Sequence, residues 1–301
     1  MIISMEKAFK SLTIFEFQAQ FPDTDSCHKH LSELKWSDGF VCPNCKHTRA
    51  SELKGSYSRK CGRCDRITST TSGTVFHKVK FDLLKAFYIV YYVSTSKKGI
   101  SSTELSRKLG LRQKTCWLFR RKIMEAMASS GTRPMEGRVD VDETVVGGQE
   151  EGVVGRKNDK KKLVAFAIEH KGKGISRMYA KVLENAGSKQ LRPFFEENVS
   201  RDAQIRTDGW RGYGPLKKDW TKLEQEESGK KGGNFKQMHR VIMGLKGWLR
   251  GIHHSVNHLQ AYLNEYSYRF NRNKMKEGVF NNLMKRMVTY PPKTYLQIIG
   301  I

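Results

Sequence analysis

Four cysteines form the sharpest spacing pattern in this sequence. Two residues separate Cys42 from Cys45 and Cys61 from Cys64, and fifteen residues lie between the pairs. Each pair can direct two thiolates at one metal from a tight knuckle, and four soft thiolates suit tetrahedral Zn²⁺. We therefore predict a structural zinc ribbon in which Gly or Pro makes the turn of each knuckle. An iron–sulfur cluster and a redox dithiol are the alternatives.

The remaining ligand-type residues near this pattern have simpler interpretations. His47 follows the first knuckle closely, but four thiolates already complete a tetrahedral site, so it is interpreted as a surface residue. Cys27 and Cys116 fall outside the spacing and are interpreted as small core residues.

A set of acids could carry metal-assisted chemistry on phosphodiesters. The run RVDVDETVVGG predicts a strand with Asp140 and Asp142 on one face and Glu143 on the other. A buried acid in such a strand is costly unless it binds a cation or a base. Asp208 ends a later short strand in RTDGW, where Gly209 lets the backbone turn; taken alone, it is better explained as a capping or turn residue. Two divalent metals held by carboxylates from a central strand, a strand end and a helix would suit phosphoryl transfer on DNA.

A helix over QMHRVIMGLKGWLR could supply the third element of such a site. His239 and Lys246 are seven residues apart, two helical turns, so both project from one face of that helix, while Gly244 points away from it. A metal ligand and a DNA-contacting lysine at this spacing would suit an active site that lies along the helix.

Residues 100–127 have the pattern of a helix-turn-helix. A small residue, Ser106, stands where two helices would meet, Gly110 follows in the turn, and Cys116 and Phe119 would pack the second helix on the first. That second helix would begin with side chains able to reach base edges or phosphates, namely Arg112, Gln113 and Lys114. Any helical hairpin with a Gly turn is the alternative.

The charge of the chain favours a nucleic-acid partner. Lys and Arg number 55 against 30 Asp and Glu, a formal net charge of +25, and the basic residues are spread along the whole chain. Such a protein attracts polyanions, of which nucleic acid is the commonest large one. A ribosome-associated factor or another basic soluble protein is the alternative.

We expect no membrane association. The most apolar run, residues 86–93, is far too short for the roughly 30 Å core of a bilayer. The start MIISMEKAFKSL lacks the apolar core and cleavage site of a secretory signal, so we expect a reducing compartment. That would be the cytoplasm and nucleoid of a bacterial-type cell, or the nucleus of a eukaryote.

The order of expected elements predicts a mixed α/β fold. Helical patterns fill residues 81–130, and from residue 138 three strand patterns are followed by a helix, a short strand and two helices near 236–250 and 256–271. This order fits a mixed sheet covered by helices. The Gly- and Lys-rich segments EEGVVGRKNDKKK and EESGKKGGN are interpreted as mobile surface loops suited to phosphate contact.

From about Phe15 to Asn273 the sequence resembles the insertion-sequence 1595 family of transposases. The motifs that carry the resemblance, in order, are FPDTDSCHKHLSELKWSDGFVCPNC, CGRCDRITSTTSGTVF, GISSTELSRKLGLRQKTCW, VDVDETVVGG, TDGWRGY, MHRVIMGLK and HLQAYLNEYSYRFNRN. The resemblance implies four segments: an N-terminal helix and zinc ribbon (1–80), a helix-turn-helix (81–130), a ribonuclease-H-like DDE-type catalytic domain (135–275) and a C-terminal extension (276–301).

The resemblance also implies roles for single residues. Asp142 and Asp208 match the first two catalytic acids of the family, and Lys246 matches the lysine that closes its motif. Related transposases usually carry Glu seven residues before that lysine, and here the spacing selects His239. Imidazole is a poorer Mg²⁺ ligand than carboxylate, so Mn²⁺ could be preferred. Glu265, which has an i,i+4 partner in Arg269, and Asn234 are weaker candidates for the third position.

The activity that follows is DNA transposition. The ribbon and the helix-turn-helix would bind terminal inverted repeats, and the catalytic domain would use Mg²⁺ or Mn²⁺ to cleave strands and join them to target DNA. Because two ends must be joined in one event, a homodimer or larger assembly on paired ends is expected. A non-catalytic DNA-binding regulator and a ribonuclease-H-like nuclease that cuts without joining are the alternatives.

Overall fold

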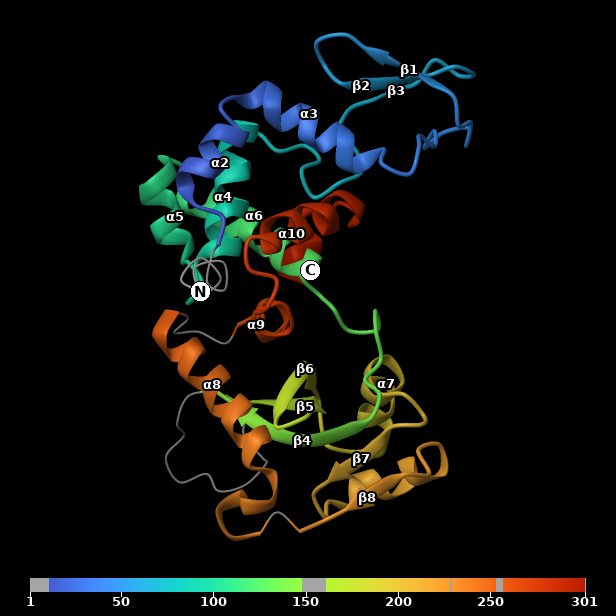
Figure 1. Ribbon diagram of the computed structural model, residues 1–301, viewed down its shortest axis with the longest axis vertical. Coiled ribbons are helices and arrows are strands. Elements are labelled where there is room, and N and C mark those ends of the chain that lie inside the picture. Colours follow the sequence, from blue (N-terminus) through green and yellow to red (C-terminus); the bar gives the residue numbers. More distant parts are fainter. Residues whose placement is uncertain (1–10, 148–160, 228, 253–256, 301) are drawn as a thin grey trace, which may run out of the picture. The chain divides into compact units, whose positions relative to one another are not determined.

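The computed structural model describes residues 11–147, 161–227, 229–252 and 257–300. They divide into two compact units (Figure 1): unit 1 holds the residues up to Met127 together with those from Lys274, and unit 2 runs from Ala128 to Asn273. The chain therefore leaves unit 1 once and returns to it. Within the described ranges, no helix is both long enough and apolar enough to cross a membrane.

Unit 2 is built on a five-stranded mixed sheet in the order β6-β5-β4-β7-β8. The first three strands form an antiparallel meander, and β7 and β8 continue the sheet in parallel beside β4. This is the mixed sheet that the order of strand and helix patterns predicts, and an antiparallel meander extended by parallel strands next to its first strand is the ribonuclease-H-like arrangement that the family resemblance implies. The strands are β4 (Arg138–Val146), β5 (Lys162–Lys171), β6 (Gly174–Leu183), β7 (Gln204–Thr207) and β8 (Leu223–Gln225).

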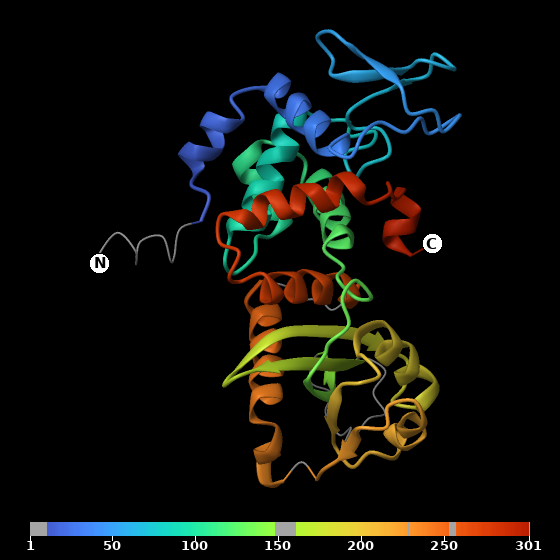
Figure 2. The same cartoon turned by 45° about the vertical axis from the view of Figure 1, so that its right-hand side comes forward.

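Helices cover both faces of this sheet because its central strands are apolar on both sides. Val139 and Val141 of β4 face a core completed by α7 and η1, whereas Val146 of β4 and Phe166 of β5 face a core completed by α8 and α9. Figures 1 and 2 show α8 running alongside the sheet. The helices of unit 2 are α7 (Ser188–Asn198), the 3₁₀ segments η1 (Arg211–Lys218) and η2 (Lys230–Phe235), α8 (Lys236–Ile252) and α9 (Leu259–Asn271).

Unit 1 is a helical bundle with a small β ribbon. Aromatic rings join its helices: Phe17 and Phe280 lie 5.7 Å apart between ring centroids, and Phe21 and Phe87 lie 5.0 Å apart. The C-terminal α10 packs against α3, α4 and α6, so residues from both ends of the chain share one core. The helices are α2 (Ile14–Gln20), α3 (Thr24–Lys35), α4 (Leu83–Thr95), α5 (Ser102–Leu109), α6 (Gln113–Ala126), α10 (Gly278–Thr289) and α11 (Tyr295–Ile299); the ribbon strands are β1 (Ala50–Leu53), β2 (Ser58–Cys61) and β3 (Ile67–Thr68).

The pair α5–α6 has the local geometry expected of a helix-turn-helix. Ser101 caps α5, and Gly110 ends it in the left-handed region at φ 60°, where glycine has no side-chain penalty. The Ser106 hydroxyl donates to the Leu111 carbonyl at 2.6 Å and ties the turn back to α5. Cys116 is buried on the inner face of α6, as predicted.

Several elements do not appear among the expected ones, namely β8, η1, α10 and α11. The three residues of β8 are too few for a period to be visible, and its pairing with β7 depends on tertiary context. In contrast, α10 does carry helical spacing, with Phe280, Leu283 and Met287 buried along one face. The predicted loop over 150–160 lies almost wholly outside the described residues, and η2 occupies part of the other segment expected to be a loop.

Candidate active site

Three carboxylates gather in the middle of the unit 2 sheet, where the pairing of β4 with β7 ends. Asp142, Glu143 and Asp208 are half-buried, and one oxygen of each lies within 4.8 Å of the others. Carboxylate oxygens are the ligands that Mg²⁺ prefers, and like charges at this separation repel one another unless a cation lies between them. The residues present therefore fit a divalent-metal site.

The geometry of β4 explains how neighbouring residues converge. Asp142 and Glu143 point to opposite faces of the strand, as predicted, because Asp142 is opposite Phe166 and Glu143 is opposite Ala165 on β5. The parallel pairing of β4 with β7 ends at Val141 and Thr207, and Asp208 is the next residue. The carboxylates of Asp142 and Glu143, although on opposite faces of β4, can therefore both approach that of Asp208 where the β4–β7 pairing ends. Glu143 is not among the metal ligands that the sequence predicts, because strand alternation puts its side chain on the face opposite Asp142. The sequence does not show where the β4–β7 pairing ends, which is what brings Glu143 and Asp208 together.

Hydrogen bonds hold the turn that presents Asp208. The Trp210 amide donates to an Asp208 carboxylate oxygen at 3.1 Å, and the Trp210 indole donates to the Ala186 carbonyl at 2.8 Å. The Gln225 side-chain amide of β8 donates to the carbonyls of Asp208 and Trp210 at 3.3 and 2.9 Å. Asp208 is therefore a turn-capping residue and a member of the acid cluster at once.

A buried tyrosine orients Glu143. The Tyr213 hydroxyl donates to a Glu143 carboxylate oxygen at 2.5 Å, and Tyr213 is fully buried. Burial and the charge of Glu143, with smaller contributions from Asp142 and Asp208, raise the pKa of Tyr213 well above its ordinary value. The phenol thus keeps its proton and remains a donor to the carboxylate.

Asp140 does not belong to the acid cluster and instead binds Arg206 and His170. Arg206 donates to both of its carboxylate oxygens at 2.9 Å, and His170 Nε2 lies 2.8 Å from one of them. Burial by itself would raise the pKa of Asp140, but the hydrogen bonds from His170 and Arg206 lower it below the ordinary value. Because Asp140 and Arg206 stand two residues before Asp142 and Asp208 on paired strands, this ion pair fixes the register that aligns the two aspartates.

We expect Asp140→Asn to destabilise unit 2 by about 3 kcal/mol, because it leaves a largely buried arginine without its main partner. Since the pKa of Asp140 is lowered on folding from 3.8, its contribution is fully present above about pH 4 and is lost as the pH falls below that value. Urea unfolding followed by tryptophan fluorescence should show the free energies of unfolding of wild type and variant converging as the pH falls below 3.8. Asp202→Asn, on an exposed acid of the same unit, is the control. A constant difference across this range would contradict the assignment.

The predicted residues of α8, His239 and Lys246, do not belong to the acid cluster. His239 is exposed and is not among the three clustered ligands. The Lys246 ammonium donates to Thr144 Oγ1 at 3.1 Å, two residues beyond Asp142 on β4. Burial, then the charges of Arg250 and Lys161, lower the pKa of Lys246.

The other two candidates for the third metal ligand, Glu265 and Asn234, make contacts with different residues. Glu265 is fully buried on α9 and pairs with Arg269 at 2.8 Å, which is the i,i+4 pair expected from the sequence. Asn234 is exposed, and its side-chain amide donates to the Glu227 carbonyl at 2.8 Å. Glu265 does not belong to the carboxylate cluster.

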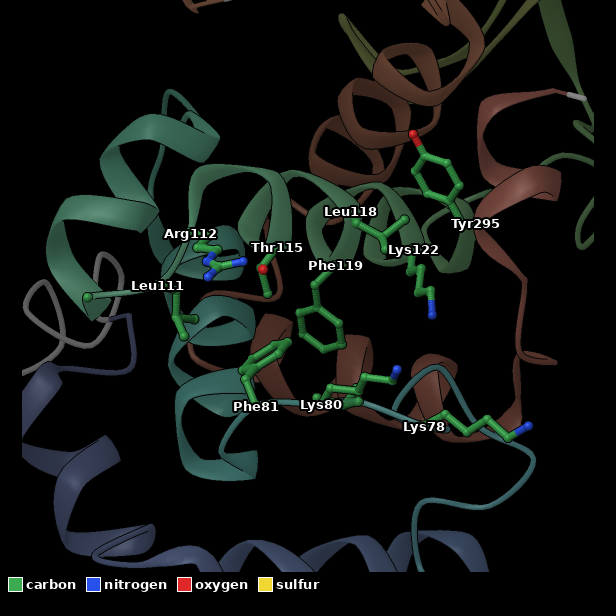
Figure 3. Close-up of a pocket in the computed structure, with 12 residues that line it drawn as sticks. Lys78, Lys80, Phe81, Leu111, Arg112, Thr115, Leu118, Phe119, Lys122 and Tyr295 are labelled. Carbon is green, nitrogen blue, oxygen red and sulfur yellow. The ribbon is translucent and has the colours of Figure 1, made fainter.

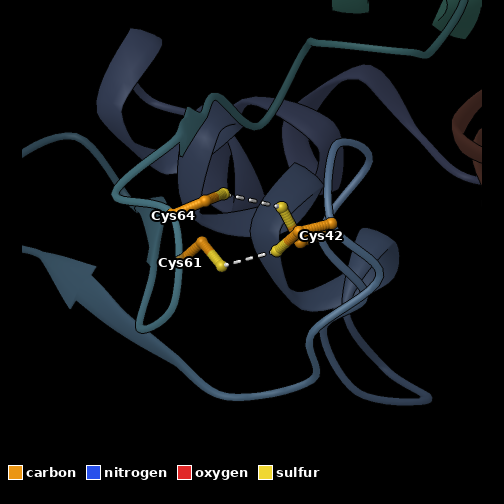
Figure 4. A group of neighbouring side chains, drawn as sticks. Cys42, Cys61 and Cys64 are labelled. Atoms are coloured by element: carbon orange, nitrogen blue, oxygen red, sulfur yellow. Dashed lines mark hydrogen bonds between the residues drawn. The ribbon is translucent and has the colours of Figure 1, made fainter.

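In unit 1 the four predicted cysteines converge (Figure 4). The sulfurs of Cys42 and Cys64 are 3.6 Å apart, as are those of Cys45 and Cys61, and all four lie within 4.8 Å of one another. Tetrahedral zinc with Zn–S bonds of about 2.3 Å places its sulfurs about 3.8 Å apart. The arrangement therefore fits one zinc ion.

The two knuckles are copies of one backbone motif. The amides of Lys46 and Asp65 donate to the carbonyls of Cys42 and Cys61 at 3.0 and 3.2 Å. Pro43 and Gly62 lie in the turns of their knuckles, as predicted, and each turn is followed by a residue with left-handed backbone, Lys46 at φ 61° and Asp65 at φ 56°. An amide hydrogen bond from Cys45 lowers the pKa of Cys42 to about 6, which favours the thiolate that zinc binds.

Comparison with known proteins agrees with both sites. Residues 22–66 match the transposase zinc-ribbon domain, and residues 134–271 match the ISXO2-like transposase domain. The α5–α6 pair lies between the matched ranges. Both cysteine pairs fall within the first range, and all three clustered acids fall within the second.

A curated relative is an uncharacterized protein in transposable element ISH50 of Halobacterium salinarum. It is 27% identical over 212 residues, which cover 63% of this chain and 68% of the relative. Among solved structures, a chain of a pre-cleavage Mos1 transpososome matches with 10% identity, 70% of this chain and 77% of that chain covered, and a TM-score of 0.30, too low for a comparison of folds. The matched ribbon and the matched catalytic-type domain, in this order and together over more than half of the sequence, show that the chain belongs to the IS1595 family of transposases.

Proposed function

We propose that this protein is an active DNA transposase that binds the terminal inverted repeats of its element, cleaves DNA strands there and joins them to target DNA. The observation that carries the proposal is the convergence of Asp142, Glu143 and Asp208 within a transposase domain. A regulator that only binds DNA has no use for three clustered carboxylates beside the central strand of its sheet.

The acid cluster is the proposed site for Mg²⁺ or Mn²⁺, held by Asp142 and Asp208 with Glu143 as a further candidate. A divalent metal bound there would activate the attacking oxygen and stabilise the leaving oxygen of the phosphodiester. Tyr213 holds the Glu143 carboxylate in place, and the Asp140–Arg206 pair keeps the two strands in register. Lys246, a cation on the same side of β4 as Asp142, would position DNA phosphates.

Two contacts between α8 and the sheet support a position for His239 at the same height along β4 as Asp142. The guanidinium of Arg206, which is paired with Asp140, lies 5.0 Å from the Phe235 ring, and Lys246 reaches Thr144. A helix advances about 1.5 Å per residue and a strand about 3.3 Å, so the four residues from Phe235 to His239 correspond to about two residues of β4. We therefore propose that the His239 imidazole swings in as an additional ligand when metal binds.

His239→Ala is expected to lower strand cleavage and strand transfer by about 10- to 100-fold, less than loss of an acid, because imidazole is the weaker ligand for a hard cation. The measurement uses labelled DNA with the flanking repeats of the gene, in Mg²⁺ and in Mn²⁺. His239→Glu should restore activity preferentially in Mg²⁺. Arg240→Ala, at the next exposed position of α8, is the matched control.

The same assay tests the proposed function. Products joined to target DNA in the wild type support a transposase. Cleavage without joining would indicate a nuclease, and repeat binding without chemistry in either metal would indicate a regulator. If His239→Ala and Arg240→Ala act alike, His239 has no part in the site.

DNA recognition is proposed for the ribbon and the helix-turn-helix. Arg112, Gln113 and Lys114 are exposed at the start of α6, where a recognition helix meets the major groove. Gln113 donates to Ser102 of α5 at 2.7 Å, which holds its side chain across the turn. The +25 net charge of the chain supports phosphate contacts around these residues.

Because both ends of an element must be joined in one event, we propose that the active form is at least a dimer on paired ends. Gel filtration and chemical crosslinking with paired-end DNA should give a complex that holds two or more chains. Only monomers on such DNA would contradict this proposal.

A further inference from the structure

Unit 1 contains a cavity of about 670 Å³ beside the start of α6. Figure 3 shows its walls: the segment from Lys78 to Phe81, the first turns of α6, and Tyr295 of the C-terminal α11. Its volume lies in the range of pockets that take small organic groups, and far exceeds what one water molecule or metal ion fills. Neither the acid cluster nor the zinc ribbon contributes to it.

Four cations and no carboxylate line this pocket. Lys78, Lys80 and Arg112 are exposed at its rim, and Lys122 is half-buried in its wall. Within the described part of the chain, none of the four is in an ion pair. Burial lowers the pKa of Lys122, as expected for an ammonium without a counter-charge. The pocket therefore attracts an anion.

The inner wall of the pocket is apolar and aromatic. The rings of Phe81 and Phe119 meet edge to face at 5.5 Å, and Leu111 and Leu118 extend the surface that they form. Tyr295 lines the pocket from α11 (Figure 3). A flat heterocycle can pack on such a wall, and base–aromatic packing tolerates any base. An apolar wall with a cationic rim matches a nucleotide, which joins a base to a phosphate.

We propose that this pocket takes one unpaired nucleotide of the DNA that unit 1 binds, with the base against the apolar wall at Phe81 and the phosphate among the lysines. The inference rests on the proposed function, because it requires DNA at the start of α6. Arg112 belongs both to the pocket rim and to the proposed recognition segment, so a nucleotide in the pocket would continue into the strand read by Gln113 and Lys114. A base stacked in an intact duplex cannot enter, which gives the pocket a preference for DNA with an unpaired end or a displaced base.

The test is fluorescence anisotropy with the full chain in its zinc-loaded form and without added Mg²⁺ or Mn²⁺. The probes are a blunt duplex that carries the terminal repeat, and the same duplex with a short 3′ or 5′ single-stranded overhang. Wild type should bind one of the overhang duplexes about tenfold more tightly than the blunt duplex, consistent with about 1–3 kcal/mol per stacked base. Lys80→Met with Lys122→Met should remove most of this gain.

A matched control distinguishes a general effect of removing two positive charges from a specific effect on the pocket. Lys29→Met with Lys97→Met removes two exposed cations of unit 1 that lie outside the pocket, and should preserve the preference for the overhang. Phe81→Leu, which keeps the apolar wall but removes its ring, should reduce the gain without changing binding of the blunt duplex.

The possible outcomes distinguish failure of the pocket proposal from failure of the proposed transposase function. Tight binding of the blunt duplex with no gain from either overhang would overturn the pocket proposal and leave the proposed function intact. Equal weakening of blunt and overhang duplexes by the lysine substitutions would also overturn it, because the pocket would then contact only a duplex backbone. Failure to bind either DNA would remove the proposed function and the pocket proposal together. If an excess of free deoxynucleotide abolishes only the overhang gain, the pocket recognises the nucleotide itself.

Discussion

Asp208→Asn is expected to lower DNA strand cleavage by a factor of at least about 10³, equivalent to about 4 kcal/mol of transition-state stabilisation. Asp142→Asn should act equally. The physical reason is the loss of one of the carboxylates that lie within 4.8 Å of one another and fit a divalent metal. The amide retains the shape of the acid but offers a neutral and weaker ligand.

The substitution is chosen so that the fold survives it. The Asp208 carboxylate accepts a hydrogen bond from the Trp210 amide, and that of Asp142 accepts one from the Glu143 amide at 2.8 Å; an asparagine oxygen can accept both. Removing a charge from three clustered carboxylates should even relieve repulsion in the metal-free protein. Loss of activity with an unchanged or raised unfolding midpoint would therefore identify a metal site and not a folding defect.

Metal-dependent stability supplies a readout apart from activity. Mg²⁺ or Mn²⁺ should raise the unfolding midpoint of the wild type, because a ligand that binds only the folded state stabilises it, and should do so much less in Asp208→Asn. Asp202→Asn removes a nearby exposed acid of unit 2 and should match the wild type. Cleavage within tenfold of wild type in Asp208→Asn would refute the assignment. Glu143→Gln, measured in parallel, decides whether the third acid binds metal.

Removal of zinc should unfold the ribbon while leaving unit 2 folded. Structural zinc contributes about 10–16 kcal/mol of apparent binding free energy in small zinc domains, and the buried apolar cluster around this site is small, consisting of Phe40 with Cys42 and Cys61. Cys61→Ser, or a strong chelator, should make residues 40–68 susceptible to protease. Because the ribbon and the acid cluster belong to different units, metal-dependent stabilisation of unit 2 should persist.

Cys27→Ser is the matched control for this prediction. It changes the same atom at a buried cysteine that lies outside the four clustered thiols. Zinc analysis should find equimolar zinc in the wild type and in Cys27→Ser and little in Cys61→Ser. Full zinc content in Cys61→Ser, or a ribbon that resists protease after chelation, would contradict a structural role for the metal.

Features that depend on local spacing could be predicted from the sequence alone. Two Cys-x-x-Cys pairs are sufficient to place four sulfurs on one metal, and the structure confirms their convergence. Alternation along RVDVDETVV correctly placed Asp142 and Glu143 on opposite faces of β4, and helical period placed Glu265 beside Arg269. Short-range patterns succeed here because each element's own geometry fixes which side chains share a face.

Pairing between distant segments was decided only by the tertiary structure. The acid cluster includes Glu143 because the β4–β7 ladder ends one residue before Asp208, and a strand's periodicity contains no information about where its partner stops. Asp140 became half of a buried ion pair because the parallel register sets Arg206 opposite it. Likewise the C-terminal α10 and α11 return to unit 1, and Tyr295 completes the wall of a pocket whose other residues lie some 170 to 220 positions earlier. Such contacts follow from packing and chain reversal, where the free energy of burying apolar surface, and not local spacing, selects which segments meet.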